Sequence, residues 1–205
     1  MPNDLPMTDT QPASQTSTTL ASPLHPPLPE AGSEQHWGRL VGNGLGLAIS
    51  SAARQHNGLV LVITDDMLFA NRLQKSIRFF NTDKEMPVLL FPDWETLPYD
   101  LYSPHPDIIS RRIETLYRLP ETRRGILIVP VSTLMQRLAP ASYLTAHSLI
   151  LDTGERIDLE AFRTRLEQAG YTCVSQVMEH GEFAIRGSLI DLYPMGSDLP
   201  YRIDL

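Results

Sequence analysis

Residues 44–147 alternate between continuous apolar runs and segments with apolar residues at helical spacing. The apolar runs predict strands at 59–64, 88–91 and 125–129. The other segments predict helices at 44–56, 66–80 and 107–119, followed by a short one from Ser132 or Thr133 to Pro140. The run at 59–64 is apolar almost throughout, which indicates a strand buried on both faces. Strands that alternate with helices are typical of an open parallel α/β sheet.

Acidic residues precede two of the predicted helices and are candidates for their N-terminal caps. Asp65 or Asp66 is expected to cap the helix that reaches Phe80, and Asp107 the next one. The buried face of the former is predicted to comprise Leu68, Phe69, Leu73 and Ile77. The pair Asp65-Asp66 after a strand also resembles a magnesium-binding strand end, but a cap explains it without a metal. The six histidines show no metal-ligand spacing, so we predict no metal site and no nucleophile.

The pattern changes near His147 and predicts a second unit over 148–205. A strand is expected at 148–151, and then a helix capped by Asp158 and ended at Gly170. Three strand-like runs follow, at 171–178, 183–193 and 201–205. A helix followed by adjacent strands suggests a small α+β domain with antiparallel pairing. Since the chain stops inside the last run, we expect this domain to be truncated.

Residues 1–36 differ in composition from the rest of the chain. Residues 1–35 hold seven prolines and nine Ser or Thr residues but no Lys or Arg. The absence of positive charge excludes the usual targeting signals, and the composition predicts a disordered tail. A proline-rich docking ligand is the alternative. The expected organisation is therefore a tail at 1–36, a first domain at 37–147 and a second at 148–205.

Composition narrows the classes of function. The chain has 17 Lys and Arg against 24 Asp and Glu, a formal charge of −7, so it lacks the basic field of a non-specific nucleic-acid binder. The single cysteine, Cys173, excludes an intrachain disulfide and a multi-cysteine zinc site, and fits a reducing, cytoplasmic location. No run of 18 apolar residues predicts a membrane span.

A glycine-rich loop precedes the first helix and invites comparison with phosphate-binding loops. Its residues are Gly42, Asn43, Gly44, Leu45 and Gly46. A working loop needs a lysine for the phosphates and a hydroxyl for magnesium, and Leu45 and Gly46 stand at those positions. We therefore interpret it as a degenerate nucleotide loop with a structural role. A working nucleotide site remains the alternative.

The stretch from Phe91 to Asp107 combines four prolines with aromatic and acidic residues. Prolines restrict the backbone and aromatic rings supply apolar area, so we predict a rigid loop packed over the end of the sheet. Stacking of its rings on a nucleic-acid base is the alternative.

Two arginines are candidates for partner recognition. In the last strand-like runs, apolar residues alternate with Arg186 and with Arg202, so both arginines are predicted on the face opposite the apolar residues. Exposed arginines on a sheet can anchor a partner's carboxylates. Ordinary solvated charges are the alternative.

Four stretches of the chain carry long motifs, at 93–112, 125–137, 176–187 and 191–197. Together they closely resemble the N-terminal region of the bacterial transcription-repair coupling factor family, over about residues 38–205. The same region is more distantly similar to UvrB, a component of the UvrABC excinuclease. The resemblance implies a RecA-like first domain whose nucleotide site has degenerated, followed by a domain that contacts the damage-recognition component, UvrA.

The resemblance also implies a function and its limits. Arg186 and Arg202 match the family's UvrA-contacting arginines, while an aromatic that completes the contact would follow the last residue. The expected function is an adaptor that recruits UvrA to RNA polymerase stalled at DNA lesions, without catalysis or cofactor in this chain. Polymerase binding and the ATP- and magnesium-dependent DNA translocase lie further downstream in the family. A nucleotide- or DNA-binding helicase half-module is the alternative function.

Overall fold

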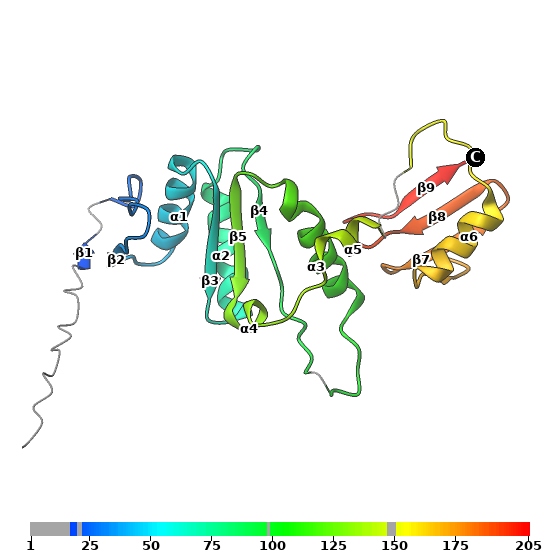
Figure 1. Ribbon diagram of the computed structural model, residues 1–205, viewed down its shortest axis with the longest axis horizontal. Helices are drawn as coiled ribbons and strands as arrows, with labels where there is room; N and C mark the ends of the chain where they lie inside the picture. Colours follow the sequence, from blue (N-terminus) through cyan, green and yellow to red (C-terminus); the bar gives the residue numbers. More distant parts are fainter. Residues whose placement is uncertain (1–16, 20–21, 98, 147–150) are drawn as a thin grey trace, which may run out of the picture.

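The computed structural model describes residues 17–19, 22–97, 99–146 and 151–205. A three-stranded parallel sheet and a four-stranded sheet, each with its own helices, form the two main parts of the molecule (Figure 1). A short parallel pair, β1 (Ser17–Thr19) and β2 (His36–Gly38), lies before them. The predicted α/β class is confirmed. Within the described ranges, no helix is long and apolar enough to cross a membrane.

The first sheet has the strand order β3-β5-β4, with all strands parallel. Its strands are β3 (Leu59–Thr64), β4 (Val88–Leu90) and β5 (Gly125–Pro130). The helices of this part are α1 (Gly44–Gln55), α2 (Met67–Phe80) and α3 (Pro106–Arg118), with the short helices η1 (Leu119–Glu121), α4 (Val131–Leu134) and α5 (Ala141–Ala146). Parallel strands need such helical crossovers between them. The alternating apolar runs therefore predicted the three strands and the helices α1, α2 and α3. The short helix predicted to reach Pro140 ends at Leu134, and α5 was not predicted.

Strand β3 is buried on one face only, which corrects the prediction. Val60 and Val62 pack against the core formed with α1 and α2. On the other face, Leu61 and Ile63 are 49% and 53% exposed. The reason is position: β5 is central and buried along its whole length, whereas β3 is an edge strand. The core on that second face forms around β4 and β5 and does not include Leu61 or Ile63.

The predicted buried face of α2 is wrong in its first turn. Leu73 and Ile77 are buried as expected, but Leu68 is 60% exposed and Phe69 41%. Ala70 is buried instead, in register with Leu73 and Ile77. Asp66 is the N-terminal cap, and its carboxylate accepts a hydrogen bond from the Phe69 backbone N–H at 2.7 Å. The cap prediction for Asp66 is thus confirmed, but the face of the helix is rotated from the one predicted.

Helix α3 begins at Pro106, two residues earlier than a cap at Asp107 would place its first residue. His105 is the capping residue, and its Nδ1 accepts a hydrogen bond from the Asp107 backbone N–H at 3.2 Å. Pro106 follows at the first helical position, where its missing N–H costs nothing and its fixed φ is helical. Asp107 lies in the first turn, where a negative charge is favourable, but it is not the cap.

The second sheet has the order β6-β7-β8-β9 and is covered on one face by α6 (Leu159–Gln168). Its strands are β6 (Thr172–Cys173), β7 (Glu182–Arg186), β8 (Leu189–Tyr193) and β9 (Tyr201–Asp204). The cap of α6 is Asp158, as predicted, and its carboxylate accepts hydrogen bonds from two backbone N–H groups at 3.0 and 3.1 Å.

The strand pairing differs from the prediction in two respects. The run 183–193 is a hairpin of two strands, which turns at Gly187 with a φ of 63°. Glycine adopts such a conformation without steric cost, so the turn splits an apparently continuous run. The run 171–178 forms only the two-residue β6, which pairs with β7 in parallel. The strand predicted at 148–151 lies largely outside the described residues.

Part of the predicted tail is packed. Pro26 is fully buried, and the Trp37 indole N–H donates a hydrogen bond to the Pro27 carbonyl at 3.2 Å. Trp37 in turn packs against the core of the first sheet. The segment 22–36 therefore makes packing and hydrogen-bond contacts with the first part of the molecule, which its composition did not predict.

Helix α3 also contacts the second sheet. The Nδ1 of His180 lies 2.9 Å from an Asp107 carboxylate oxygen, and its Nε2 lies 2.8 Å from the Ser197 carbonyl. One turn further along α3, the Ser110 hydroxyl accepts a hydrogen bond from the Gly196 backbone N–H at 2.9 Å. These contacts join the two parts of the molecule.

Candidate partner-binding surface

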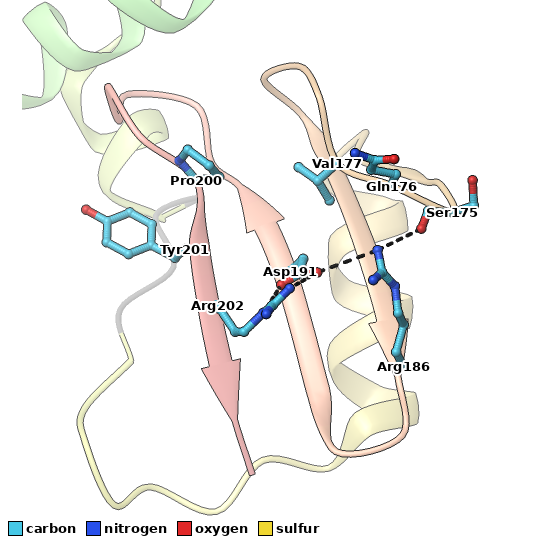
Figure 2. Close-up of a pocket in the computed structure, with 8 residues that line it drawn as sticks. All are labelled: Ser175, Gln176, Val177, Arg186, Asp191, Pro200, Tyr201 and Arg202. Atoms are coloured by element: carbon cyan, nitrogen blue, oxygen red, sulfur yellow. Dashed lines mark hydrogen bonds and ion pairs between the residues drawn. The ribbon is translucent and has the colours of Figure 1, made fainter.

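A groove of about 740 Å³ lies on the face of the second sheet opposite α6, and we name it the two-arginine groove (Figure 2). It is lined by Ser175, Gln176, Val177, Arg186, Asp191, Pro200, Tyr201 and Arg202. The opposite face carries the small core of this part, in which Phe183 and Ile190 are fully buried against α6. Because side chains along a strand point alternately to opposite faces, one face of this sheet packs against α6 and the other is free to bind a partner.

The structure brings the two predicted arginines to this groove from different strands. Arg186 ends β7 and Arg202 lies in β9, and their side chains are 53% and 61% exposed. Both arginines lie opposite the core residues Phe183 and Ile190, as predicted. Tyr201, which alternation places on the face of Ile203, is instead 58% exposed and lines the groove.

Asp191 lies between the two arginines on β8 and contacts both. Its two carboxylate oxygens accept hydrogen bonds from Nε and Nη2 of Arg202 at 2.6 and 2.9 Å. A third nitrogen, Nη2 of Arg186, is 3.7 Å from Oδ2 of Asp191. Figure 2 shows both guanidinium groups directed toward this carboxylate, whose side chain is only 15% exposed. Hydrogen bonds from Arg202 hold the pKa of Asp191 below its usual value despite desolvation, and raise the pKa of Arg202.

Sequence reasoning missed Asp191 because its role depends on strand register. It pairs directly with Arg202 across the antiparallel β8–β9 ladder. Cross-strand neighbours of opposite charge stabilise such a ladder. An acidic residue within an apolar strand was visible in the sequence, but pairing it with Arg202 required the register set by the connection between β8 and β9.

The remaining wall of the groove is held by a second acidic residue. The Glu182 carboxylate accepts hydrogen bonds from the backbone N–H groups of Met178 and Glu179, at 2.7 and 2.9 Å. These bonds lower the pKa of Glu182. They order the segment that carries Ser175–Val177, and the Ser175 carbonyl accepts a hydrogen bond from Arg186 at 2.9 Å.

The charges in the groove suit an acidic partner. Two guanidinium groups face one carboxylate, which leaves one net positive charge among the lining residues. The side chains of Val177, Pro200 and Tyr201 add apolar surface beside the charges. A guanidinium binds carboxylates in a planar, two-pronged geometry. The arrangement can therefore hold a protein segment that carries a carboxylate next to an apolar side chain.

The glycine loop is remote from this groove and is organised by packing. The Gly44 backbone N–H donates to the Val41 carbonyl at 3.0 Å, so a turn uses one of the N–H groups that a phosphate would need. Leu45 packs against the core of the first sheet. At Gly46, a Cβ atom would lie 2.8 Å from the Cβ of Ser76 on α2. Asn43 precedes α1 without a capping side-chain hydrogen bond, and Gly42 has a φ of 58°.

The other candidates for chemistry do not assemble into a site. Throughout the described part of the chain, no group of three or more His, Cys, Asp or Glu side chains could hold a metal. Asp66 serves as a helix cap, as described above. Cys173 is exposed on β6.

The proline-rich loop after β4 is anchored at its base by Arg112 of α3. This guanidinium is buried between the rings of Phe91 and Trp94, 4.2 and 4.0 Å from their centroids. It donates hydrogen bonds to the Pro92 carbonyl and, at 3.2 Å, to Gln136. Burial lowers the pKa of Arg112 to about 10, although the nearby charge of Asp93 opposes this.

Asp93 completes this cluster. Its carboxylate accepts hydrogen bonds from the Ser132 hydroxyl at 2.8 Å and from the Gln136 amide at 3.0 Å. Desolvation raises the pKa of Asp93, but these bonds, the Trp94 N–H and the Arg112 charge together lower it below its usual value.

The tip of the same loop is not packed, which corrects the prediction. Its large apolar side chains, Leu97, Tyr99, Leu101 and Tyr102, are all strongly exposed. Only the base, from Phe91 to Trp94, lies against the end of the sheet. The prolines restrict the backbone without bringing the tip back to the core.

Comparison with known proteins bears directly on the two-arginine groove. The family model described as the UvrB interaction domain matches residues 149–205, which include the whole groove. The transcription-repair-coupling factor of Escherichia coli (strain K12) is 50% identical over 175 residues, which are 85% of this chain and 15% of that protein. The protein of the same name from Haemophilus influenzae is 46% identical over 170 residues, 81% of this chain and 15% of the relative.

A more distant relative extends the comparison. The transcription-repair-coupling factor of Staphylococcus aureus (strain USA300) is 31% identical over 157 residues, 77% of this chain and 13% of that protein. The chain thus spans 15% or less of the length of these relatives. It belongs to the family of bacterial transcription-repair coupling factors, as an N-terminal region of such a protein.

Proposed function

We propose that this chain is a non-catalytic adaptor module that binds UvrA, the damage-recognition component of the UvrABC excinuclease. The observation that carries the proposal is the position of Arg186 and Arg202. Both are exposed on the polar face of one sheet, within the segment that matches the UvrB interaction domain. An acidic, partly apolar segment of UvrA is the expected occupant of the two-arginine groove.

In the whole protein, this module would recruit UvrA to RNA polymerase stalled at a DNA lesion. We assign the polymerase contact, DNA binding and ATP-driven translocation to parts of the protein outside these 205 residues. The ATP and magnesium that the motor needs belong there as well. The protein would act in the bacterial cytoplasm, where transcription and excision repair take place.

Two observations favour an adaptor over a nucleotide-dependent helicase half-module. Leu45 packs against the core and Gly46 adjoins Ser76, so neither position offers a lysine or a hydroxyl to a nucleotide. The chain also carries a net charge of −7, which opposes independent binding to nucleic acid.

Replacing Arg186 and Arg202 together by alanine is expected to weaken UvrA binding by about tenfold or more. Arginines near the centre of an interface are frequent hot spots. Both side chains are exposed, so the chain should still fold, with a small loss of stability from the ion pairs to Asp191. The measurement is calorimetric titration of the 205-residue chain with purified UvrA, together with the thermal midpoint of each variant.

The matched control replaces Arg163 and Arg165 by alanine. Both are exposed on α6, which covers the opposite face of the sheet, so the control removes the same charge without touching the groove. Binding that weakens equally in both double variants would reflect net charge alone and would contradict the proposal.

A further inference from the structure

We infer that Asp191 is the positioning residue of the two-arginine groove: it holds both guanidinium groups in the arrangement that receives a carboxylate of the partner. This inference rests on the proposed function and deepens it. It concerns a residue that need not touch UvrA itself, since its carboxylate is already occupied by Arg202 and faces Arg186.

The physical basis is the freedom of long side chains. A free arginine samples many rotamers, and ordering one at an interface costs conformational entropy. Arg202 is held by two parallel hydrogen bonds to Asp191, a geometry that fixes the plane of the guanidinium as well as its position. Much of its ordering therefore occurs before the partner arrives.

Arg186 is held from two sides. Its Nη2 donates to the Ser175 carbonyl at 2.9 Å and lies 3.7 Å from Asp191. Asp191 is thus the one described side chain that contacts both arginines, and it comes from the strand between theirs. Two like charges would otherwise repel each other, and the carboxylate between them reduces that repulsion.

Enough hydrogen-bonding capacity remains for a partner. A guanidinium has five N–H groups, and Arg202 uses Nε and one hydrogen of Nη2 on Asp191. The Nη1 group of Arg202 is still available. The contacts of Arg186 with Ser175 and Asp191 involve only its Nη2, so its Nη1 and Nε are available as well. One net positive charge also remains, so the internal carboxylate orients the arginines without neutralising the groove.

The test is the isosteric variant Asp191→Asn. It keeps the size of the side chain but removes the charge that holds both arginines. We expect UvrA binding to weaken by about tenfold, because two arginines must then be ordered during association. The matched control is Glu167→Gln, which removes a carboxylate that pairs with Arg163 at 2.9 Å on α6, away from the groove.

A double-mutant cycle separates positioning from a general structural role. If Asp191 acts through the two arginines, the Asp191→Asn change should have a smaller effect in an Arg202→Ala background, where only Arg186 is left to position. Equal weakening in both backgrounds would overturn the inference, and so would Asp191→Asn binding as tightly as the parent or more tightly. Tighter binding would mean that Asp191 competes with the partner for the arginines.

A measurement without UvrA keeps the two proposals distinguishable. In the parent, the Arg202 Nε–H is hydrogen-bonded to Asp191, so its NMR resonance should shift and exchange faster with water in Asp191→Asn. If the parent chain does not bind UvrA, the proposed function fails. The inference that Asp191 positions the arginines for UvrA then fails as well, even if this resonance responds. If the parent binds but the resonance does not respond, only the inference about Asp191 fails.

Discussion

Replacing Arg112 by methionine is expected to lower the free energy of unfolding by about 3 kcal/mol. Methionine fills similar space but cannot donate to the Pro92 carbonyl or to Gln136, and it leaves Asp93 without its nearby cation. The loss is large because Arg112 is buried and stacked between two rings. Removing one partner from such a buried network leaves the remaining polar groups without hydrogen-bond partners.

Urea unfolding measures this effect, with tryptophan fluorescence as the signal, since Trp94 stacks on Arg112. The control is Arg111→Met, a change of the same kind at the exposed neighbouring position of α3. It should change the unfolding free energy little. Similar losses in the two variants would mean that Arg112 stabilises the protein only through its net charge.

Rebuilding a phosphate-loop hydroxyl by Gly46→Thr is expected to destabilise the protein by about 3 kcal/mol and to create no nucleotide site. The new Cβ would lie 2.8 Å from the Cβ of Ser76 and 3.2 Å from its carbonyl carbon. Helices α1 and α2 would have to separate, which opens the core that Leu45 also helps to form. Thermal unfolding and calorimetric titration with magnesium-ATP measure the two outcomes.

Gly44→Thr is the matched control for this prediction. It makes the same substitution in the same helix, where a Cβ would meet only a Leu40 methyl at an ordinary 3.8 Å. We expect little loss of stability there. If Gly46→Thr folded as well as the control and bound ATP, the loop would be a nucleotide site that lacks only its hydroxyl.

The pattern of apolar residues predicted the order of elements because each element is decided locally. A continuous apolar run specifies a strand, and a helix cap is set by one residue such as Asp66 or Asp158. The exposed face of β3 could not be predicted in this way. Its burial depends on how far the neighbouring elements extend over the sheet, which is a property of the tertiary arrangement.

The candidate site shows the same division. Alternation within a strand was enough to place Arg186 and Arg202 on the polar face, because side-chain direction has a period of two. It could not reveal Asp191, whose partner is fixed by the register between β8 and β9. That register is set by the connection between β8 and β9, residues 194–200, while the turn at Gly187 hides the start of β8 inside what reads as one long strand.

Helix α3 is shared between the two parts of the molecule, and this has a consequence for how they denature. Arg112 and Thr115 bind carbonyls at the end of the first sheet, while Asp107 and Ser110 hold turns of the second. Melting of α3 would release both sets of contacts at once. Heat denaturation monitored by calorimetry should therefore give one cooperative peak, and a His180→Ala change should split it in two. The thermal stability of the sheet that carries the arginines would then depend in part on contacts with a helix that is distant in sequence.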